Sequence, residues 1–279
     1  MPGRAAGLVL LSALLHAVWN ALVKREKNPR SAGLAVLFVA TAAAAALTPF
    51  ADPPAFPSHA SLLWALSAGL FEGAYFATLG LALALGPLGP VYTVARGGAM
   101  LVAWPVSAVF LGEPFPWPAR IGVILIGGGL ALTALRPREH ATPASLGWAA
   151  ACAVCIGGYH LCYKLALEAG AEPRALFAAA LACAWPINAV WNGRNALWDG
   201  WRALRASPVA IVAGGLTCTA SFVLFLYALA ITGAGAVLTL RNTSVLFAYL
   251  LAVAGGERPN ARALGGAALV VVGTLLLTR

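Results

Sequence analysis

The sequence predicts an all-α integral membrane protein whose ten transmembrane helices form two inverted five-helix repeats. Of its 279 residues, 61% are apolar and only 10% are charged, whereas an ordinary soluble domain has roughly 45–50% apolar and 25% charged residues. The chain also divides into ten apolar stretches, and its two halves share residues at corresponding positions. Because each span needs about 20 apolar residues, ten spans leave no room for a sizeable soluble domain.

Each apolar stretch ends at residues that interrupt a helix. Residues 24–30 are charged, Pro53 and Pro54 cannot continue a helix, and residues 86–90 form a Gly-Pro turn. The longest connection, about 192–207, combines tryptophans with arginines and predicts a short helix in the membrane interface. The predicted spans lie near 5–23, 32–50, 61–85, 88–111, 118–135, 145–167, 174–191, 208–231, 234–254 and 261–278.

Membrane electrostatics account for the net charge of +9. Most of the 18 Lys and Arg residues lie at the ends of apolar stretches, where they meet lipid headgroups. The sequence has no basic stripe with interleaved aromatic residues, so we expect no nucleic-acid partner.

Corresponding residues recur in the two halves. A shift of 140 residues aligns Lys24 with Lys164, and a shift of 145 aligns Arg96 with Arg241. An odd number of spans per half makes the second half begin on the opposite face of the membrane, so the repeats are expected to be inverted. The predicted repeats are residues 1–139 and 140–279.

Five segments carry a family resemblance: residues 15–25 (LHAVWNALVKR), 90–97 (PVYTVARG), 111–113 (LGE), 240–247 (LRNTSVLF) and 256–258 (GER). Together with the repeat, they resemble the EamA-type transporters of the drug/metabolite transporter superfamily over essentially the whole chain. The resemblance implies a secondary carrier, often an exporter of amino acids or other small metabolites, with a central cavity between the halves.

Glu72, Arg96 and Arg241 fall inside predicted spans, where a charge is costly and therefore suggests a function. Glu72 lies near the middle of its span, and burial there favours its neutral form. We therefore assign proton coupling to Glu72. The alternative is that Glu72 pairs with Arg96 and serves folding alone.

Arg96 and Arg241 each lie about eight residues inside a helix, counted from a short hairpin. Inversion is expected to place them near opposite mouths of the cavity. Two guanidinium groups against one carboxylate favour a substrate with a negative group, such as an amino acid or an organic acid. Alternatively, each arginine hydrogen-bonds the carbonyl groups of its hairpin and stabilises the repeat.

Aromatic and polar residues at similar depths complete the predicted substrate site. An alternative role for the histidines and aromatic residues is to seal helix interfaces. Glu113 and Glu257 stand at corresponding helix ends and are predicted to be gate or cap residues. The candidate substrate-binding residues are His16, Trp19, Asn20, Tyr75, Arg96, Tyr159, His160, Tyr163, Arg241, Asn242 and Ser244.

The leading functional hypothesis is an exporter of small metabolites that works by alternating access, either as a proton-linked carrier or as an exchanger. The alternative is a flippase for a lipid-linked sugar phosphate, because a phosphate would also suit Arg96 and Arg241. The sequence contains neither a His-Glu-x-x-His nor a Gly-x-Ser-x-Gly motif. We therefore expect no enzyme activity, catalytic residue, metal or cofactor.

The expected partners are a small-molecule substrate and the lipid bilayer, with the chain as a monomer or homodimer. The Arg-rich and Ala-rich composition favours a bacterial inner membrane. The charges of the connections favour termini outside the cell, whereas the family resemblance implies cytoplasmic termini. The sequence therefore leaves the orientation and the direction of transport open.

Overall fold

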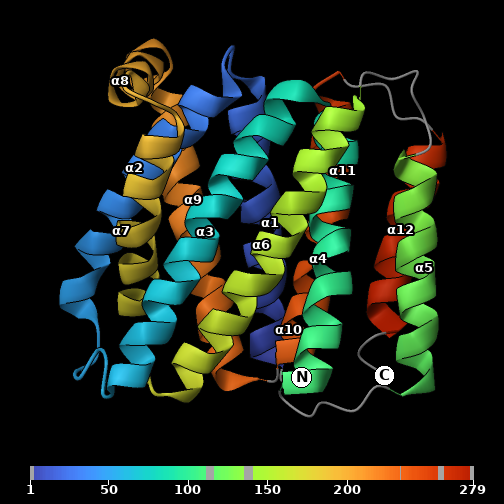
Figure 1. Ribbon diagram of the computed structural model, residues 1–279, viewed down its shortest axis with the longest axis horizontal. Coiled ribbons are helices and arrows are strands. Elements are labelled where there is room, and N and C mark those ends of the chain that lie inside the picture. Colours follow the sequence, from blue (N-terminus) through green and yellow to red (C-terminus); the bar gives the residue numbers. More distant parts are fainter. Residues whose placement is uncertain (1–2, 111–115, 135–140, 233, 257–260, 277–279) are drawn as a thin grey trace.

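The computed structural model describes residues 3–110, 116–134, 141–232, 234–256 and 261–276, and its regular structure there is helical (Figure 1). A short 3-10 turn, η1 (Thr48–Phe50), follows the second helix. The helices are α1 (Gly3–Arg25), α2 (Pro29–Leu47), α3 (His59–Leu85), α4 (Leu88–Phe110), α5 (Trp117–Ala134), α6 (Pro143–Glu168), α7 (Pro173–Trp191), α8 (Ala196–Ala206), α9 (Pro208–Ile231), α10 (Ala234–Arg241), α11 (Ser244–Ala254) and α12 (Ala261–Leu276).

Within the described ranges, six helical segments are long and apolar enough to cross a membrane. They are α1, α2 with η1, α3, α6, α7 and α9, and α11 is a shorter apolar helix. An all-helical membrane protein is therefore confirmed. Apart from the 234–254 stretch, the helix ends agree with the predicted spans to within the few residues by which such boundaries ordinarily differ.

Polar side chains cap the helices at the predicted breaks. Asn28 accepts a hydrogen bond from the Ser31 backbone N–H at 3.2 Å at the start of α2, and Thr142 accepts one from the Ser145 N–H at 3.1 Å at the start of α6. Proline stands in the first turn of both helices. A backbone N–H at that position has no acceptor within the helix, so the N–H that proline lacks is not missed. The interruptions in the apolar pattern therefore coincide with favourable helix starts.

The predicted span 234–254 is wrong as a single helix, because the chain breaks between α10 and α11. The Thr243 N–H bonds to the Leu240 carbonyl at 3.2 Å, and the Thr243 hydroxyl donates to the same carbonyl at 2.7 Å. A side chain that bonds to nearby backbone competes with the helical ladder. Arg241 is consequently the last residue of a short helix.

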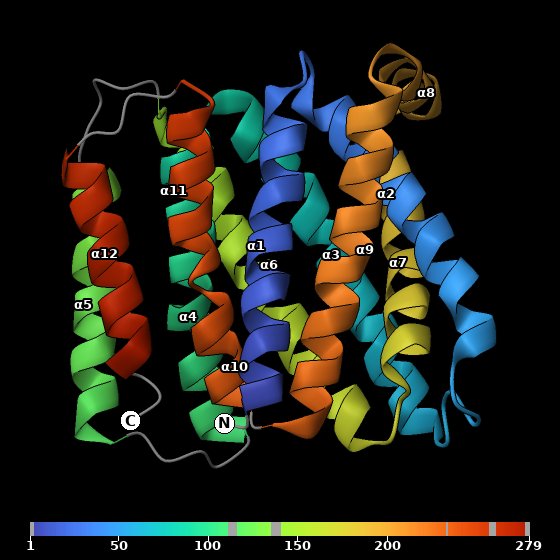
Figure 2. The same cartoon turned by 180° about the vertical axis from the view of Figure 1, so that it is seen from behind.

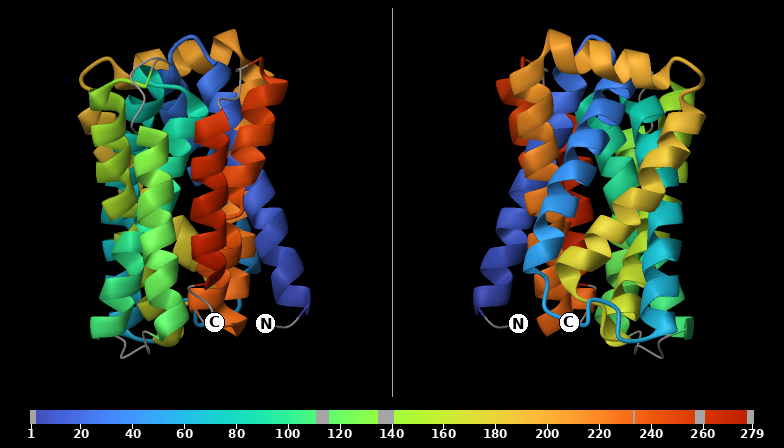
Figure 3. Two further views of the ribbon diagram at one scale, coloured as in Figure 1. Left: turned by 90° about the vertical axis from the view of Figure 1, so that its right-hand side faces the viewer. Right: turned by 90° about the vertical axis from the view of Figure 1, so that its left-hand side faces the viewer.

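The helices form a bundle with distinct edges (Figures 1 and 2). α5 and α12 lie together at one edge, and α2 and α7 lie at the other. Between them, α3 packs on α6 and α1 packs on α9. Both termini lie at the same end of the bundle, and α8 crosses the opposite end (Figure 3). The predicted short helix between residues 192 and 207 is confirmed as α8.

Glycines allow α5 and α12 to approach closely. A Cβ atom added at Gly129 would lie 2.5 Å from the Gly266 carbonyl oxygen, and one added at Gly273 would lie 2.5 Å from the Gly122 oxygen. The start of α5 therefore faces the end of α12, so the two helices are antiparallel. Small residues at such a contact let helix backbones pack tightly in a membrane.

Candidate functional site

Ionisable side chains from five helices meet in the buried interior of the bundle. His16 of α1, Glu72 of α3, Arg96 of α4, His160 of α6 and Arg241 of α10 are all at most 4% exposed. The surrounding core is largely apolar. Charged groups in such surroundings need polar or charged partners, so the contacts that each one makes define what the site can bind.

Arg241 is held by two histidines and two phenylalanines. Its Nη1 lies 3.3 Å from His160 Nε2, and its Nη2 lies 3.3 Å from His16 Nδ1. The guanidinium also stacks over the rings of Phe222 at 4.6 Å and Phe225 at 4.0 Å. Since a guanidinium only donates hydrogen bonds, both imidazole nitrogens must accept. Arg241 is thus bound by side chains of three other helices, and among the described residues it makes no hydrogen bond to a carbonyl group of its own hairpin.

His16 organises the neighbouring face of α1. Its Nδ1 also accepts from Trp19 Nε1 at 3.4 Å, so the ring proton resides on Nε2, which faces the Tyr75 hydroxyl at 3.4 Å. Asn20 donates from Nδ2 to the His16 carbonyl oxygen at 2.7 Å. Its Oδ1 is buried and has no partner among the described residues. The Asn20 oxygen is therefore an acceptor available to a ligand.

Glu72 is bound by a tyrosine. The Tyr163 hydroxyl donates to Glu72 Oε2, while Glu72 Oε1 is buried without a hydrogen-bond partner among the described residues. In the same part of the chain, Glu72 makes no ion pair with Arg96 or Arg241. The alternative of a Glu72–Arg96 pair is therefore wrong, and the contact links α3 with α6 instead.

Arg96 is less completely bound than Arg241. Its Nε and Nη2 atoms are buried and have no hydrogen-bond partner among the described residues. Both arginines interact electrostatically with His16 and Tyr75, so the expectation that they lie near opposite mouths is wrong. Each arginine lies about eight residues from its hairpin, and eight residues of helix span about 12 Å, which is close to half of a hydrocarbon core about 30 Å thick. The two side chains therefore approach the same midplane from opposite ends.

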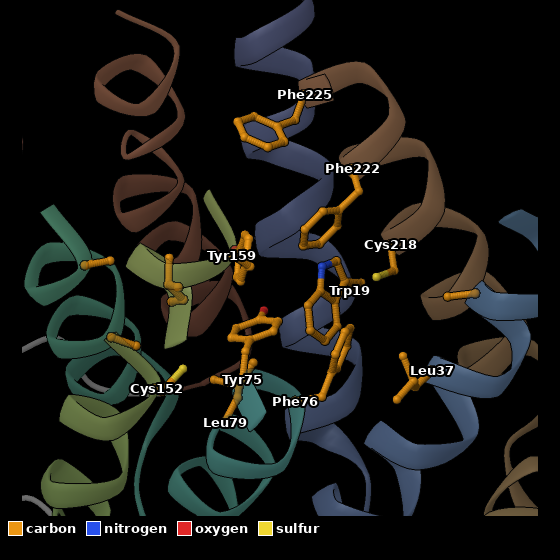
Figure 4. Close-up of a cluster of buried hydrophobic side chains, with 14 of the residues drawn as sticks. Trp19, Leu37, Tyr75, Phe76, Leu79, Cys152, Tyr159, Cys218, Phe222 and Phe225 are labelled. Carbon is orange, nitrogen blue, oxygen red and sulfur yellow. The ribbon is translucent and has the colours of Figure 1, made fainter. Parts of the chain in front are cut away.

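Aromatic rings gather in the buried core, among them those of Trp19, Tyr75, Tyr159 and Phe222 (Figure 4). The ring of Tyr159 lies 5.5 Å from that of Tyr75, 5.6 Å from that of Tyr163 and 4.4 Å from that of His160, measured between centroids. The Tyr159 hydroxyl is buried without a partner among the described residues. Aromatic walls with a few unpaired polar atoms are typical of small-molecule sites.

The remaining predicted residues are placed less centrally or lie outside the described residues. Ser244 is buried near Tyr92, and Asn242 is buried at the break between α10 and α11. Glu113 and Glu257, the predicted gate or cap residues, lie outside the described residues.

Sequence reasoning missed three residues of this cluster. Phe222 and Phe225, which stack on Arg241, are three residues apart and share a helix face. Tyr92 lies one turn before Arg96 and interacts with it electrostatically. Helical spacing from a buried arginine could have identified Tyr92, whereas the contact of α9 with Arg241 depends on the fold.

The fold and the site define an integral membrane protein with a positively charged, aromatic-lined centre. The model of the EamA-like transporter family matches residues 144–279. Residues 144–279 thus carry an EamA-like domain, and the EamA-like family, part of the drug/metabolite transporter superfamily, is a family of transporters and not of enzymes. The predicted family resemblance is thereby confirmed for residues 144–279, and for residues 1–143 it stays a prediction.

A solved crystal structure supports the fold. It aligns over 100% of this chain and 97% of its own chain, with a TM-score of 0.65 and 19% sequence identity. At that identity the similarity concerns the fold alone. No curated protein matches the chain.

Proposed function

We propose that this protein is a secondary transporter that exports small carboxylate-bearing metabolites, such as amino acids or organic acids, across a bacterial inner membrane. The observation that carries the proposal is the pair of buried guanidinium groups with unpartnered nitrogens. Arg96 Nε and Nη2 and Arg241 Nε lack hydrogen-bond partners among the described residues. A carboxylate can accept two parallel hydrogen bonds from an arginine, and its charge would offset the buried positive charge.

The proposed mechanism is alternating access between two inverted repeats, residues 1–139 and 140–279. In this scheme α1 corresponds to α6, and α3 corresponds to α9. Exchanging the halves then converts the α1–α9 contact into the α6–α3 contact, and both are extensive. The reciprocal glycine contacts of α5 with α12 fit an axis between these two helices. Rocking of such halves around a central site is a common transport mechanism.

Two contacts of the site cross between the proposed halves. Arg241 of the second half binds His16 of the first, and Tyr163 of the second half donates to Glu72 of the first. Rocking of the halves would stretch both contacts. Substrate binding at the arginines would thus be coupled to the protonation of Glu72, to which we assign proton coupling.

Counterflow in proteoliposomes tests this function. Vesicles with purified protein are loaded with amino acids, organic acids or sugar phosphates, and labelled uptake is measured at two pH values. We expect saturable exchange of one carboxylate class. Glu72→Gln should retain exchange and lose its pH dependence, because the amide mimics the neutral acid. Glu168→Gln, which removes a half-exposed carboxylate paired with Lys164, is the matched control and should behave as wild type.

The outcomes separate the possible substrates. Exchange that is absent for every soluble solute, together with movement of a fluorescent lipid-linked sugar phosphate between leaflets, would replace the carrier with a flippase. Unchanged pH dependence in Glu72→Gln would remove the proton-coupling role of Glu72 alone.

A further inference from the structure

An apolar cleft lies beneath α8, away from the central site. It has a volume of about 300 Å³ and opens between α2, α7 and α8. Leu34 and Phe38 of α2, Trp185 of α7, and Trp201 and Leu204 of α8 line it. Figure 3 shows α8 lying across the ends of these neighbouring helices. The walls are suited to hydrocarbon because almost all of their surface is apolar and offers water few hydrogen-bonding groups.

A smaller polar pocket adjoins this cleft. It has a volume of about 110 Å³ and lies where α2 begins and α7 ends. Leu34 and Ala196 line both spaces, so the apolar cleft and the polar pocket are adjacent. The polar residues of the pocket are Asn28, Arg30, Ser31, Asn192 and Asp199.

The polar pocket presents one cation and one anion. Among the described residues, neither Arg30 nor Asp199 forms an ion pair. Amides at Asn28 and Asn192 and a hydroxyl at Ser31 add uncharged hydrogen-bonding groups. This set complements a small zwitterion, with a phosphate near Arg30 and an ammonium group near Asp199.

The polar pocket and the apolar cleft lie at successive depths along α2. From Asn28 in the polar pocket to Phe38 in the cleft, α2 advances ten residues, which corresponds to about 15 Å. The polar pocket thus lies at the end of the bundle, and the apolar cleft runs toward its middle. A phospholipid has the same order, with its headgroup at the surface and its acyl chain in the membrane interior.

The surface of α8 is typical of a helix at headgroup level. Arg202 lies 5.3 Å over the ring of Trp198, and Arg205 lies 4.9 Å over the ring of Trp201. Both tryptophans are exposed. Tryptophan and arginine on an amphipathic helix favour the interface, where the ring contacts lipid and the cation contacts phosphate.

We propose that the cleft beneath α8 binds one phospholipid with a phosphoethanolamine headgroup. The headgroup occupies the polar pocket between Arg30 and Asp199, and one acyl chain lies in the apolar cleft against Phe38 and Trp185. The bound lipid contacts both α2 and α7, which also pack on each other. It therefore bridges helices from the two proposed halves. This site is separate from the central cluster and does not depend on the transported substrate.

Lipid retention tests the site directly. The full-length protein is reconstituted in nanodiscs of equal parts phosphatidylethanolamine and phosphatidylglycerol, extracted in mild detergent, and examined by native mass spectrometry. We expect wild type to retain one phosphatidylethanolamine, preferred over phosphatidylglycerol by about tenfold, because only the former supplies a cation for Asp199.

Gly200→Leu tests the cleft. A Cβ atom at Gly200 would lie 3.6 Å from Leu34, an ordinary contact, so the larger side chain fills the cleft without a backbone clash. Leucine is also a better helix former than glycine. We expect retained lipid to fall by about tenfold. Gly7→Leu is the matched control, because nothing lies within 4 Å of its added Cβ.

Two further variants test the headgroup. Asp199→Asn should remove the preference for phosphatidylethanolamine, and Arg30→Gln should weaken retention of both lipids. Equal retention of both lipids by wild type would overturn the headgroup assignment. Equal lipid content in Gly200→Leu and Gly7→Leu would overturn the site itself. A dimer that forms in wild type and is lost in Gly200→Leu would mean that a second copy of the chain, and not a lipid, occupies the cleft. That result would also overturn the proposal.

Discussion

Arg96 and Arg241 occupy corresponding positions in the two halves of the chain, but their surroundings differ. Arg241 bonds to His16 and His160 and stacks on two phenylalanines. Arg96 leaves two buried nitrogens without partners among the described residues. The two side chains thus differ in degree: among the described residues Arg241 lacks a partner only at Nε, whereas Arg96 lacks partners at both Nε and Nη2.

The backbone differs in the same way. α4 continues through Arg96, whereas α10 ends at Arg241. Residues 97 and 98 are glycines that stay helical, while Asn242 and Thr243 form the break. We therefore propose that Arg241 chiefly stabilises the site and that Arg96 contributes more to substrate binding. Substitutions at corresponding positions should separate the two roles.

Arg96→Gln should have the largest effect on transport. Loss of a buried charge-assisted contact costs about 2–5 kcal/mol, so exchange should fall by about thirtyfold or more. The melting temperature should stay the same or rise, because an incompletely paired buried charge is removed. Counterflow and thermal unfolding in detergent measure the two effects. Arg120→Gln, an exposed arginine on α5, is the control, and normal exchange by Arg96→Gln would contradict the proposed site.

Arg241→Gln should instead reduce stability. Its two hydrogen bonds to histidines involve a charged donor, and such bonds contribute about 1.5–3 kcal/mol each. With a loss of about 3 kcal/mol, the melting temperature should fall by roughly 10 °C. Equal melting temperatures for the variants at positions 96 and 241 would show that the two arginines are equivalent after all.

The α5–α12 contact contains two glycines, one in each half, whose substitution should reduce stability equally. Gly129→Leu and Gly273→Leu each introduce a Cβ atom 2.5 Å from a backbone oxygen of the facing helix. Overpacking of this kind costs about 1–3 kcal/mol. Both variants should lower the melting temperature by a similar amount. Gly128→Leu, with nothing within 4 Å of its Cβ, should not. A large difference between the first two would argue against a symmetric contact.

Substitutions of Lys24 and Lys164 should give the smallest difference in stability between the two halves. Lys24 donates to the carbonyl oxygens of Leu83 at 2.9 Å and Gly86 at 2.8 Å, at the end of α3. Lys164 pairs with the half-exposed Glu168 at 3.3 Å. Lys24→Met should lower stability by about 1 kcal/mol. Lys164→Met should have almost no effect, since exposed pairs contribute less than about 1 kcal/mol. Thermal unfolding compares the two variants, and an equal loss would contradict this assignment.

The positions of the helices were largely predictable because they depend on local properties. A run of about 20 apolar residues forms a helix in lipid, where every backbone group must be satisfied within the segment. The break after Arg241 was harder to predict, because hydropathy does not register the competition of the Thr243 hydroxyl for a backbone carbonyl. The buried charges were also identifiable, since few residues of that type occur within apolar stretches.

The sequence by itself determined the membrane class, the helix positions and the ionisable residues of the interior, because hydrophobicity and charge belong to individual residues. The partners of those residues were decided by the tertiary structure. Arg241 meets His16 across 225 residues of chain at 3.3 Å, and Tyr163 reaches Glu72 across 91. No local pattern encodes such pairs. The packing of the helices sets which faces meet, and the cost of leaving a buried polar group unpaired then selects the pairs that form.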